Sequence, residues 1–359
     1  MYPHAEIDSA TISVSITGHK IGPTHPVFVV AEVGVNHDGT LDKALVLIDK
    51  AADAGADAVK FQMFRASELA TAAAPKAAYQ AGCQNRTSQQ DMLSALELSI
   101  EAFAAIKKHC DDRGIVFLAT PFGPEDVTRL ASLQVAALKI ASTDLTNEPL
   151  LTATGQTGLP LILSTGASTE EEVRRCMEVR RQQGALGRLI LMHCVSAYPT
   201  PLEAINLRTI ATLRQAFRVP CGLSDHTTSV ETGAWAVAAG ACILEKHFTH
   251  DRNAVGPDHA MSLEGGQLGD YITRIRLLER SMGDGKLGMS PLEADVRKVA
   301  RKSVVVTKSI PIGTVLTDAM LTCKRPGTGI SPVDLPSLVG RRTTVDIPSD
   351  TVLSWNMVR

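Results

Sequence analysis

The chain has 359 residues, of which 44% are hydrophobic and only 4% aromatic, and its formal net charge is −2. This nearly neutral balance excludes the broad basic surface that nucleic-acid-binding proteins carry. No stretch has the ~20 apolar residues of a membrane span, and the opening MYPHAEIDSA lacks the basic and apolar regions of an export signal. Seven cysteines without a CxxC pair are typical of a reduced, cytoplasmic protein. Three of them, Cys194, Cys221 and Cys242, lie in apolar runs and are expected in the core.

Short apolar runs alternate with longer amphipathic segments from residue 27 to about residue 283. Eight runs are predicted to be strands, at 27–32, 57–62, 115–120, 136–141, 160–165, 188–194, 219–224 and 242–248. Helical spacing of apolar residues predicts helices at 41–54, 101–113, 124–133, 168–183, 206–217 and 229–240. Eight strand–helix units favour an α/β fold of the (β/α)8 TIM-barrel type. A doubly wound open sheet is the alternative, but no GxGxxG follows the first strand.

The composition changes after residue 283. Residues 284–297 are rich in glycine and charge, which is typical of a linker, and residues 298–359 are rich in β-branched residues and turns. We therefore predict a barrel domain at 1–283, a linker at 284–297 and a small β-rich domain at 298–359. A domain of that size buries little surface alone, so it is expected to dock elsewhere, for example on another subunit.

The loop after the second predicted strand is long, covering 63–98, and contains Pro75, Lys76, Tyr79 and Gln80. Long loops at this end of a barrel usually border the active site. A solvated loop without a ligand is the alternative, and the residues favour neither.

Polar and ionisable residues gather at the carboxyl ends of the predicted strands. In chain order they are Glu32, Lys60, Gln62, Thr120, Lys139, Ser142, Ser164, His193, Tyr198, Ser224, Asp225, His226, Glu245 and His247. Side chains alternate along a strand, so Lys60 shares a face with Gln62, and Glu245 shares one with His247. In a closed barrel the inward faces meet at one catalytic mouth. Any one of these residues would be ordinary packing, but so many unpaired buried charges would be costly.

Two groups of these residues suggest chemistry. Lys60 and Lys139, with nearby serines, suit a phosphate together with a carboxylate, although a strand-end lysine can instead form a Schiff base. His226 and His247 follow adjacent strands, and two imidazoles with open positions suit Zn²⁺, Mn²⁺ or Fe²⁺. Hydrogen-bonded core histidines are the alternative for this pair.

The carboxyl-terminal domain contains KRPGTGIS at 324–331. Arg325 precedes a rigid proline and a glycine-rich turn, which would fix the direction of its side chain. A solvated arginine beside an ordinary turn is the alternative.

Nine motifs between about residue 27 and residue 358 match those of a known protein family in order and spacing. They are AEVGVNHDG (31–39), AGADAVKFQ (54–62), ATPF (119–122), LKIAS (138–142), LSTGAST (163–169), HCVSAYPTP (193–201), GLSDHT (222–227), EKHFTHDRNAVGPDHAMSLE (245–264) and KRPGTGIS (324–331). Together they resemble the sialic acid synthase family. The resemblance implies a (β/α)8 barrel followed by an antifreeze-like (SAF) domain, in a domain-swapped homodimer whose small domains cap the partner's barrel. It also implies condensation of phosphoenolpyruvate with the open-chain aldehyde of N-acetylmannosamine or a related N-acyl hexosamine, with C–O cleavage and release of phosphate.

The same resemblance implies roles for individual residues. It implies a divalent-metal site, usually for Mn²⁺ with Mg²⁺ or Co²⁺ as substitutes, at His226 and His247. The implied phosphoenolpyruvate site contains Lys60, Thr120, Lys139, Ser142, Ser164 and Ser224, with the lysines as anion holders. Implied sugar contacts are Glu32, Gln62, Asp144, Tyr198, Asp258 and Arg325, the last supplied by the other subunit. The implied catalytic residues are Glu32, Lys60, Lys139 and Glu245, with Glu245 beside the metal.

Departures from the family pattern concern the sugar. Thr143 and Asp144 follow LKIAS where the family often has Gly-Glu, and Ser196 occupies a position that can be Asn. The expected activity is that of an N-acetylneuraminate synthase. The alternative is an N,N'-diacetyllegionaminate synthase that uses 2,4-diacetamido-2,4,6-trideoxymannose, with a pseudaminate synthase as third choice.

Overall fold

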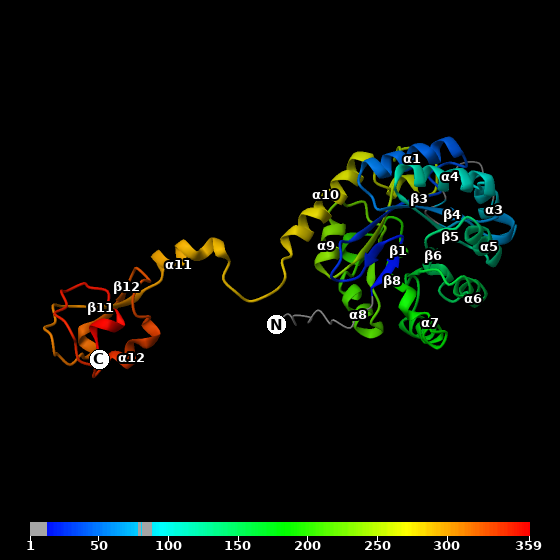
Figure 1. The fold of residues 1–359 in the computed structure, drawn as a ribbon. Helices are drawn as coiled ribbons and strands as arrows, with labels where there is room; N and C mark the ends of the chain where they lie inside the picture. The colour runs from blue at the N-terminus through cyan, green and yellow to red at the C-terminus, as the bar shows by residue number, and fades with distance from the viewer. Residues whose placement is uncertain (1–12, 78–79, 81–87) are drawn as a thin grey trace. The chain divides into compact units, whose positions relative to one another are not determined.

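The computed structural model describes residues 13–77, 80 and 88–359. The chain divides between Gly283 and Asp284 into two compact units, each with its own hydrophobic core. The first unit is a closed barrel of parallel strands (Figure 1). Its eight strands are β3 Phe28–Gly34, β4 Ala58–Met63, β5 Val116–Pro121, β6 Leu138–Ile140, β7 Leu161–Ser164, β8 Leu189–His193, β9 Cys221–Asp225 and β10 Ile243–His247. They follow one another in chain order and β10 pairs with β3, so the eight predicted strands and the barrel are confirmed.

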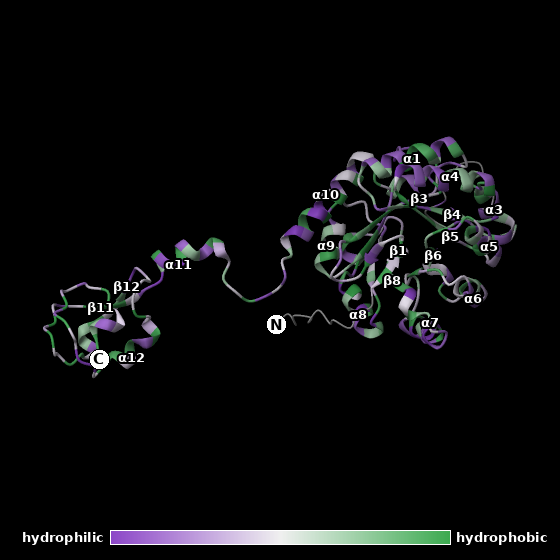
Figure 2. Ribbon diagram, viewed as in Figure 1, coloured by the Kyte–Doolittle hydropathy of each residue, from purple (hydrophilic) through white to green (hydrophobic). Residues whose placement is uncertain are grey.

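Helices between the strands cover the outside of the barrel. They are α1 Leu41–Asp53, α4 Ile100–Arg113, α5 Pro124–Ser132, α6 Glu148–Gln156, α7 Glu170–Gln182, α8 Arg208–Phe217, α9 Thr232–Ala238 and α10 Gly265–Ser281. Their mixed colours in Figure 2 reflect amphipathic sequences, with apolar residues such as Leu47 and Ile106 buried. α6 and α10 were not among the predicted helices. α10 begins with two glycines, which are poor helix formers, and it is started by a capping box between Glu264 and Gln267.

An amino-terminal hairpin closes one end of the barrel. Its strands, β1 Val14–Ile16 and β2 His19–Ile21, pair around a turn in which Thr17 and Gly18 both have positive φ. The apolar side chains of the hairpin are fully buried and pack with the inward side chains at the amino ends of the barrel strands, such as Phe28. The interior of the barrel is therefore apolar at this end, and polar side chains are confined to the other end.

The long loop after β4 contains two short helices, α2 Ala66–Leu69 and α3 Gln89–Ser94. Glu97, near the end of the loop, accepts a hydrogen bond from the backbone N–H of Ala66 at 2.6 Å. This contact joins the two ends of the loop. Of the residues singled out in the sequence, Tyr79 lies outside the described residues.

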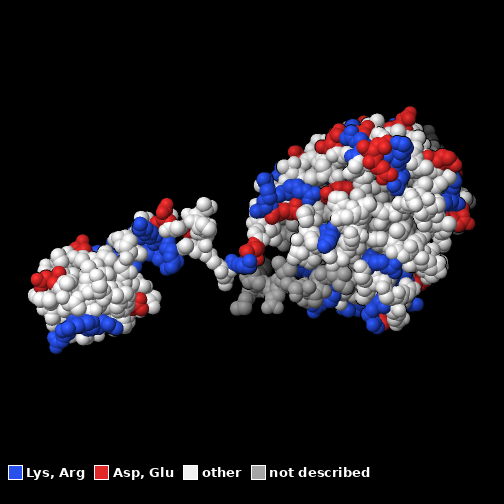
Figure 3. Space-filling view, viewed as in Figure 1, with Lys and Arg blue, Asp and Glu red and all other residues white. Residues whose placement is uncertain are grey.

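The distribution of charge on the surface agrees with the nearly neutral composition of the chain. Lysines and arginines are interspersed with acidic residues on the visible face of the barrel unit (Figure 3). In the described part of the chain, no helix combines the length and the apolar character needed to cross a bilayer. The three cysteines expected in the core are buried, as predicted.

The second unit is a small β-rich fold with a core of its own. β11 Ser303–Val306 pairs antiparallel with β12 Leu321–Lys324, and isolated bridges connect further extended segments. The stretch predicted as a linker is partly helical, because a turn at Pro291–Glu293 leads into α11 Ala294–Ala300. One more short helix, α12 Leu335–Leu338, packs into this core.

Candidate active site

A layer of polar side chains lies at the carboxyl ends of the strands, beyond the apolar interior of the barrel. In β3, for example, Val30 belongs to the interior cluster and Glu32, two residues on, belongs to the polar layer. The other buried members of the layer are Lys60, Thr120, Lys139, Ser164, Ser224, His226, Glu245 and His247.

Lys60 lies at the centre of this layer. Its Nζ is 2.8 Å from Glu32 Oε2, 2.9 Å from Thr120 Oγ1 and 3.8 Å from Glu245 Oε2. Burial would lower the pKa of Lys60, but the carboxylates of Glu245 and Glu32 outweigh burial and raise that pKa above its ordinary value. Lys60 is therefore a permanent cation inside the site.

Glu245 connects the two lysines. Its Oε1 accepts a hydrogen bond from Ser224 Oγ at 2.9 Å and lies 3.6 Å from Lys139 Nζ. Burial opposes its ionisation, yet Lys139 and Lys60 hold the pKa of Glu245 well below its ordinary value. The pKa of Glu32 is raised instead, because burial outweighs the attraction of Lys60 and Glu245 adds repulsion. Two lysines thus lie beside Glu245, which is firmly ionised, and Glu32, whose ionisation is disfavoured by burial. Their ammonium groups are placed to pair with an anionic ligand as well.

Lys139 differs from Lys60 in the direction of its pKa shift. Burial lowers the pKa of Lys139, and the attraction of Glu245 makes up only part of that change. A lysine that forms a Schiff base needs a lowered pKa. If the enzyme formed an imine with its substrate, Lys139 would therefore be the lysine that forms it. Its ammonium nevertheless lies within reach of an ionised carboxylate, which favours the charged form.

Hydroxyl groups continue the layer beyond Lys139. Ser142 and Ser196 share a hydrogen bond of 3.1 Å between their hydroxyls. Ser164 Oγ is buried and has no hydrogen-bond partner among the described residues, so its donor is left for a ligand. Gly166 allows the loop after β7 to approach these groups, since a Cβ there would lie 2.5 Å from Cys194 Sγ and 2.7 Å from Ser196 Oγ.

The two histidines lie side by side at the same mouth. Their ring centroids are 5.5 Å apart, and Tyr198 packs on His226 with centroids 4.4 Å apart. His226 Nδ1 donates to the carbonyl of Val195 at 2.7 Å, which leaves the lone pair on Nε2. Burial lowers the pKa of both histidines, and the proximity of His226 lowers that of His247 further. Both rings are therefore neutral near pH 7, the form that binds metals.

A second group of polar side chains lies between β3, β4 and the loop after β10. Gln62 Nε2 donates to Glu32 Oε1 at 3.2 Å, and Asp258 Oδ2 lies 3.9 Å from His247 Nδ1. Burial, with the charge of Glu32 added, raises the pKa of Asp258 to about 7. Gly34 lies between these groups with a φ of +56°, and a Cβ there would be 3.2–3.3 Å from Asp258, Gln62 and Glu32. Glycine at this position keeps three polar side chains open to one ligand.

The residues that hold Asp258 in place were not predicted from the sequence. His259, the next residue, lies between Asp38 Oδ1 at 2.9 Å and Thr249 Oγ1 at 2.6 Å. Ser262 Oγ donates to the carbonyl of Asp258 at 2.6 Å, and Asn36 Nδ2 donates to Ser262 Oγ at 3.0 Å. The polar residues of the motif at 31–39 were the available signal, because Asn36 and Asp38 belong to it.

Four candidates stand apart from this cluster, and one of them, Asp225, points to the outside of the barrel and pairs with Lys246. His193 ends β8 as predicted, but its side chain points outward, donates to the carbonyl of Ile205 at 2.7 Å and lines a groove between α7 and α8. It therefore does not join the other strand-end residues at the mouth of the barrel. Asp144 accepts a hydrogen bond from Asn147 Nδ2 at 2.9 Å, next to the start of α6. Arg325 is exposed in the second unit.

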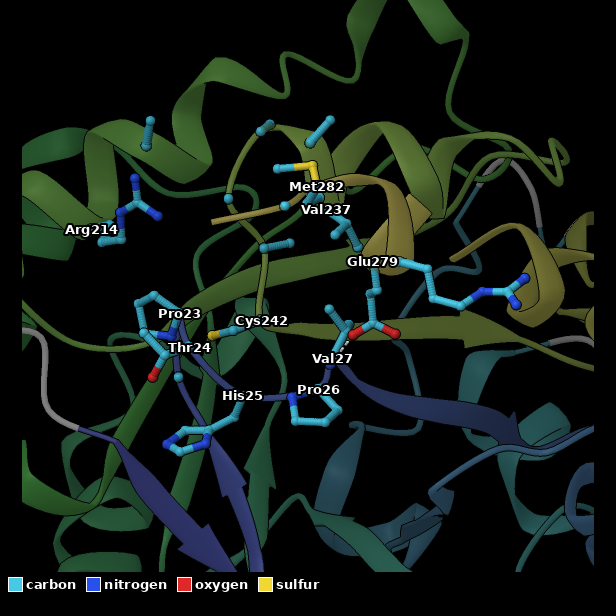
Figure 4. A pocket seen from close by; sticks show the side chains of 18 residues that line it. Pro23, Thr24, His25, Pro26, Val27, Arg214, Val237, Cys242, Glu279 and Met282 are labelled. Carbon is cyan, nitrogen blue, oxygen red and sulfur yellow. Dashed lines mark hydrogen bonds between the residues drawn. The ribbon is translucent and has the colours of Figure 1, made fainter. Parts of the chain in front are cut away.

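A cavity of about 840 Å³ lies at the amino ends of β3 and β10 (Figure 4). It is bordered by the loop before β3, by Arg214 of α8 and by the end of α10, where Glu279 accepts a hydrogen bond from the backbone of Val27. None of the predicted site residues lines it. The ionisable groups at the other end of the barrel, and not the size of this cavity, therefore locate the active site.

The fold and the polar layer define a barrel enzyme with its site at the carboxyl ends of the strands, followed by a small second domain. The chain belongs to the NeuB family, whose model matches residues 47–287, and residues 301–359 match the SAF domain. The predicted family, barrel and SAF domain are thus confirmed. The chain is an enzyme of the sialic acid synthase type, a class that uses phosphoenolpyruvate and an amino sugar.

Relatives of this type cover nearly the whole chain. The N,N'-diacetyllegionaminic acid synthase of Campylobacter jejuni is 39% identical over 90% of this chain and 98% of that protein. The human N-acetylneuraminate-9-phosphate synthase is 32% identical over 95% of each chain. The crystal structure of an N-acetylneuraminic acid synthetase from Leptospira borgpetersenii in complex with citrate superposes with a TM-score of 0.72, at 34% identity over 80% of this chain and 95% of that one.

Proposed function

We propose that this chain condenses phosphoenolpyruvate with the open-chain aldehyde of a 2-acylamino sugar and releases phosphate. The observation that carries the proposal is the buried group of Lys60, Lys139 and Glu245 beside two neutral histidines. Two cations with adjacent hydroxyls match the carboxylate and phosphate of phosphoenolpyruvate. Thr120, Ser142, Ser164 and Ser224 supply these hydroxyls, and Ser164 has its donor free in the described structure.

The histidine pair fits a divalent metal. His226 carries its lone pair on Nε2 because Nδ1 donates to a carbonyl, and Ser224 Oγ lies 3.4 Å from that Nε2. His247 Nδ1 is buried without a hydrogen-bond partner among the described residues. No group of three or more histidine, cysteine or acidic side chains with metal-binding geometry occurs in the described part of the chain. Two imidazoles with water and substrate in the open positions suit a divalent transition metal. The resemblance to the family, and not the ligand set, is the reason to propose Mn²⁺, with Mg²⁺ or Co²⁺ as substitutes.

The residues of the site support the following sequence of steps. Lys60 and Lys139 hold phosphoenolpyruvate so that its C3 faces the aldehyde carbon, and the new C–C bond forms between these atoms. A bound metal would polarise the aldehyde oxygen. Glu245, ionised and hydrogen-bonded to Ser224, orients the water that adds at C2. The C2–O bond to phosphate then breaks, and the lysines stabilise the departing charge, giving a 2-keto acid and inorganic phosphate.

Glu32, Gln62 and Asp258 are proposed to bind the sugar, together with Tyr198 and Asp144. The sequence motifs alone favour N-acetylmannosamine as this sugar. The identities favour 2,4-diacetamido-2,4,6-trideoxymannose, because two N,N'-diacetyllegionaminic acid synthases are 39% and 36% identical to the chain while the human synthase is 32% identical. We therefore propose that the diacetamido sugar is the preferred substrate.

A phosphate-release assay tests both parts of this proposal. Phosphate is expected to form from phosphoenolpyruvate only when an acylamino sugar and Mn²⁺ are both present, and kcat/KM is expected to be at least about tenfold higher for the diacetamido sugar. Phosphate release without any sugar would contradict the condensation. A higher kcat/KM for N-acetylmannosamine would reverse the order of the two sugars and leave the reaction intact.

We also propose that Arg325 serves the site of a second copy in a domain-swapped homodimer. Its side chain is exposed, and a hydrogen bond from its Nε to the carbonyl of Ala300, at 3.0 Å, orients it. The following turn is fixed by Ser303, whose hydroxyl donates to the carbonyl of Pro326 at 2.7 Å and accepts from the backbone N–H of Gly329 at 2.9 Å. A guanidinium held in this way suits recognition of an acyl carbonyl.

Mixing two inactive variants tests this arrangement. Lys60→Met and Arg325→Ala are expected to be inactive or nearly so alone, and co-expression is expected to restore about a quarter of the activity by random pairing. Half of the dimers would then be mixed, and each mixed dimer would have one intact site. If Arg325 acted on its own barrel, no mixed dimer would contain a complete site and the mixture would stay inactive.

A further inference from the structure

Strands β9 and β10 carry three successive pairs of polar residues at their carboxyl ends. Ser224 faces Glu245 and Asp225 faces Lys246 in the register of the ladder, and His226 and His247 come next. The first and third pairs point into the site. The middle pair, Asp225 and Lys246, points to the outside of the barrel and takes no part in the chemistry proposed above.

The middle pair is a fully buried ion pair. Lys246 is 0% exposed and Asp225 is 1% exposed. Lys246 Nζ lies 2.8 Å from Asp225 Oδ2, 2.6 Å from the carbonyl of Thr227 and 3.2 Å from Thr227 Oγ1. The three donors of the ammonium are thus all used. Asp225 is equally occupied, since it accepts from the backbone N–H of Thr227 at 2.9 Å and from the hydroxyl of Thr232.

Two helices enclose this pair. Thr232 begins α9, and the ring of Tyr271 from α10 lies 5.4 Å from Lys246 Nζ. Gly233 makes room for that ring, because a Cβ there would be 2.4 Å from Tyr271 Cζ. The ion pair therefore ties the end of β9 to β10 and to both neighbouring helices.

The ion pair of Asp225 and Lys246 lies at the last paired residues of β9 and β10. The ladder between β9 and β10 ends at Asp225 and Lys246, so His226 has no backbone partner on β10. His226 is held on one side by the carbonyl of Val195 and by Thr200, whose N–H donates to the carbonyl of His226 at 2.9 Å. On the other side Asp225 and Thr227, the residues before and after it, are both held by Lys246.

From this geometry we infer that Lys246 and Asp225 are positioning residues that fix the imidazole of His226 in the active site. The inference rests on the proposed function in that it assigns His226 a metal to bind. Contacts around a metal ligand commonly change metal affinity by ten- to a hundredfold. The ordinary alternative is an ion pair that only stabilises the fold, and such pairs can often be replaced by neutral residues without loss.

The neutral double variant Lys246→Met with Asp225→Asn separates these alternatives. It leaves no buried charge unpaired, and the asparagine can still accept from the Thr227 N–H and donate to a neighbouring hydroxyl. Arg180→Met is a matched control, because Arg180 is a buried cation bonded to Leu151 and Glu148 on α6, away from β9 and β10. Thr227→Val is a milder second variant that removes one contact of Lys246 and keeps the side-chain volume.

The first readout is the ¹⁵N spectrum of the His226 ring in the metal-free enzyme, identified by its loss in His226→Gln. Wild type and Arg180→Met are expected to show a single tautomer protonated at Nδ1. The double variant is expected to show averaged tautomers, with Thr227→Val in between. The second readout is Mn²⁺ affinity by electron paramagnetic resonance, expected to be at least about tenfold weaker in the double variant and unchanged in the control.

An unchanged His226 spectrum in the folded double variant would overturn the inference, whatever its activity. If the double variant does not fold, the same spectrum of Thr227→Val decides the question. A wild-type enzyme that binds no Mn²⁺ would contradict the proposed metal site instead, and the ring spectrum would still decide the role of the ion pair.

Discussion

Lys60→Met is expected to lower the rate of phosphate release by at least about a thousandfold. Removing one preorganised donor to a developing charge commonly costs a hundred- to a thousandfold in kcat. Here the loss is larger because Lys60 also holds Glu32 at 2.8 Å and faces Glu245 at 3.8 Å. Without it, two buried carboxylates would lie beside the anionic substrate with Lys139 as the remaining cation of the group. The measurement is phosphate release with saturating sugar and Mn²⁺.

Two further measurements make this result specific. Lys108→Met removes an exposed lysine that pairs with Asp112 on α4, and its activity is expected to stay within about twofold of wild type. A thermal melt of Lys60→Met checks that the loss is not unfolding. Substantial phosphate release by the folded variant would contradict an anion-holding role. Borohydride trapping of pyruvate on Lys139, whose pKa is lowered by burial, would support a Schiff-base enzyme instead.

The barrel, and the gathering of most candidate residues at one end of it, were predictable because both depend on local patterns. Strands buried on two faces read as short apolar runs, and alternation along a strand fixes which residues share a face. Glu245 and His247 were assigned to one face in this way, as were Lys60 and Gln62. Closure of the barrel then brings the inward faces together without further information from the sequence.

The positions that could not be predicted depend on contacts between distant segments. His193 ends its strand like the other candidates, but the register of β8 in the barrel turns it toward α8. The pairing of Lys246 with Asp225, and the contacts of His259 with Asp38, join segments that no periodicity connects.

The amino-terminal hairpin had a readable signal, since Val14 and Ile16 alternate with polar residues before a glycine. The sequence carries no comparable signal for the position of this hairpin at the end of the barrel. Which end of the barrel a hairpin fills is set by the apolar side chains already present there, such as Phe28.

His247→Ala is expected to abolish the response of the enzyme to Mn²⁺. Its imidazole is neutral because burial and the neighbouring His226 lower its pKa, and its Nδ1 has no hydrogen-bond partner in the described structure. Removing one of two protein ligands is expected to weaken Mn²⁺ binding by at least about a hundredfold. In wild type, a chelator should stop phosphate release and added Mn²⁺ should restore it. In His247→Ala, added Mn²⁺ should not restore it.

Two further histidine variants show whether the loss of Mn²⁺ binding is specific to the pair His226 and His247. His109→Ala removes a histidine that contacts Asp49 on the outer helices and is expected to bind Mn²⁺ as wild type does. His226→Ala is expected to behave like His247→Ala, because the two rings lie 5.5 Å apart and share one site. A full Mn²⁺ response in both variants would mean that the histidines are packing residues. A loss in only one would mean that the metal is held by that ring with groups other than its neighbour.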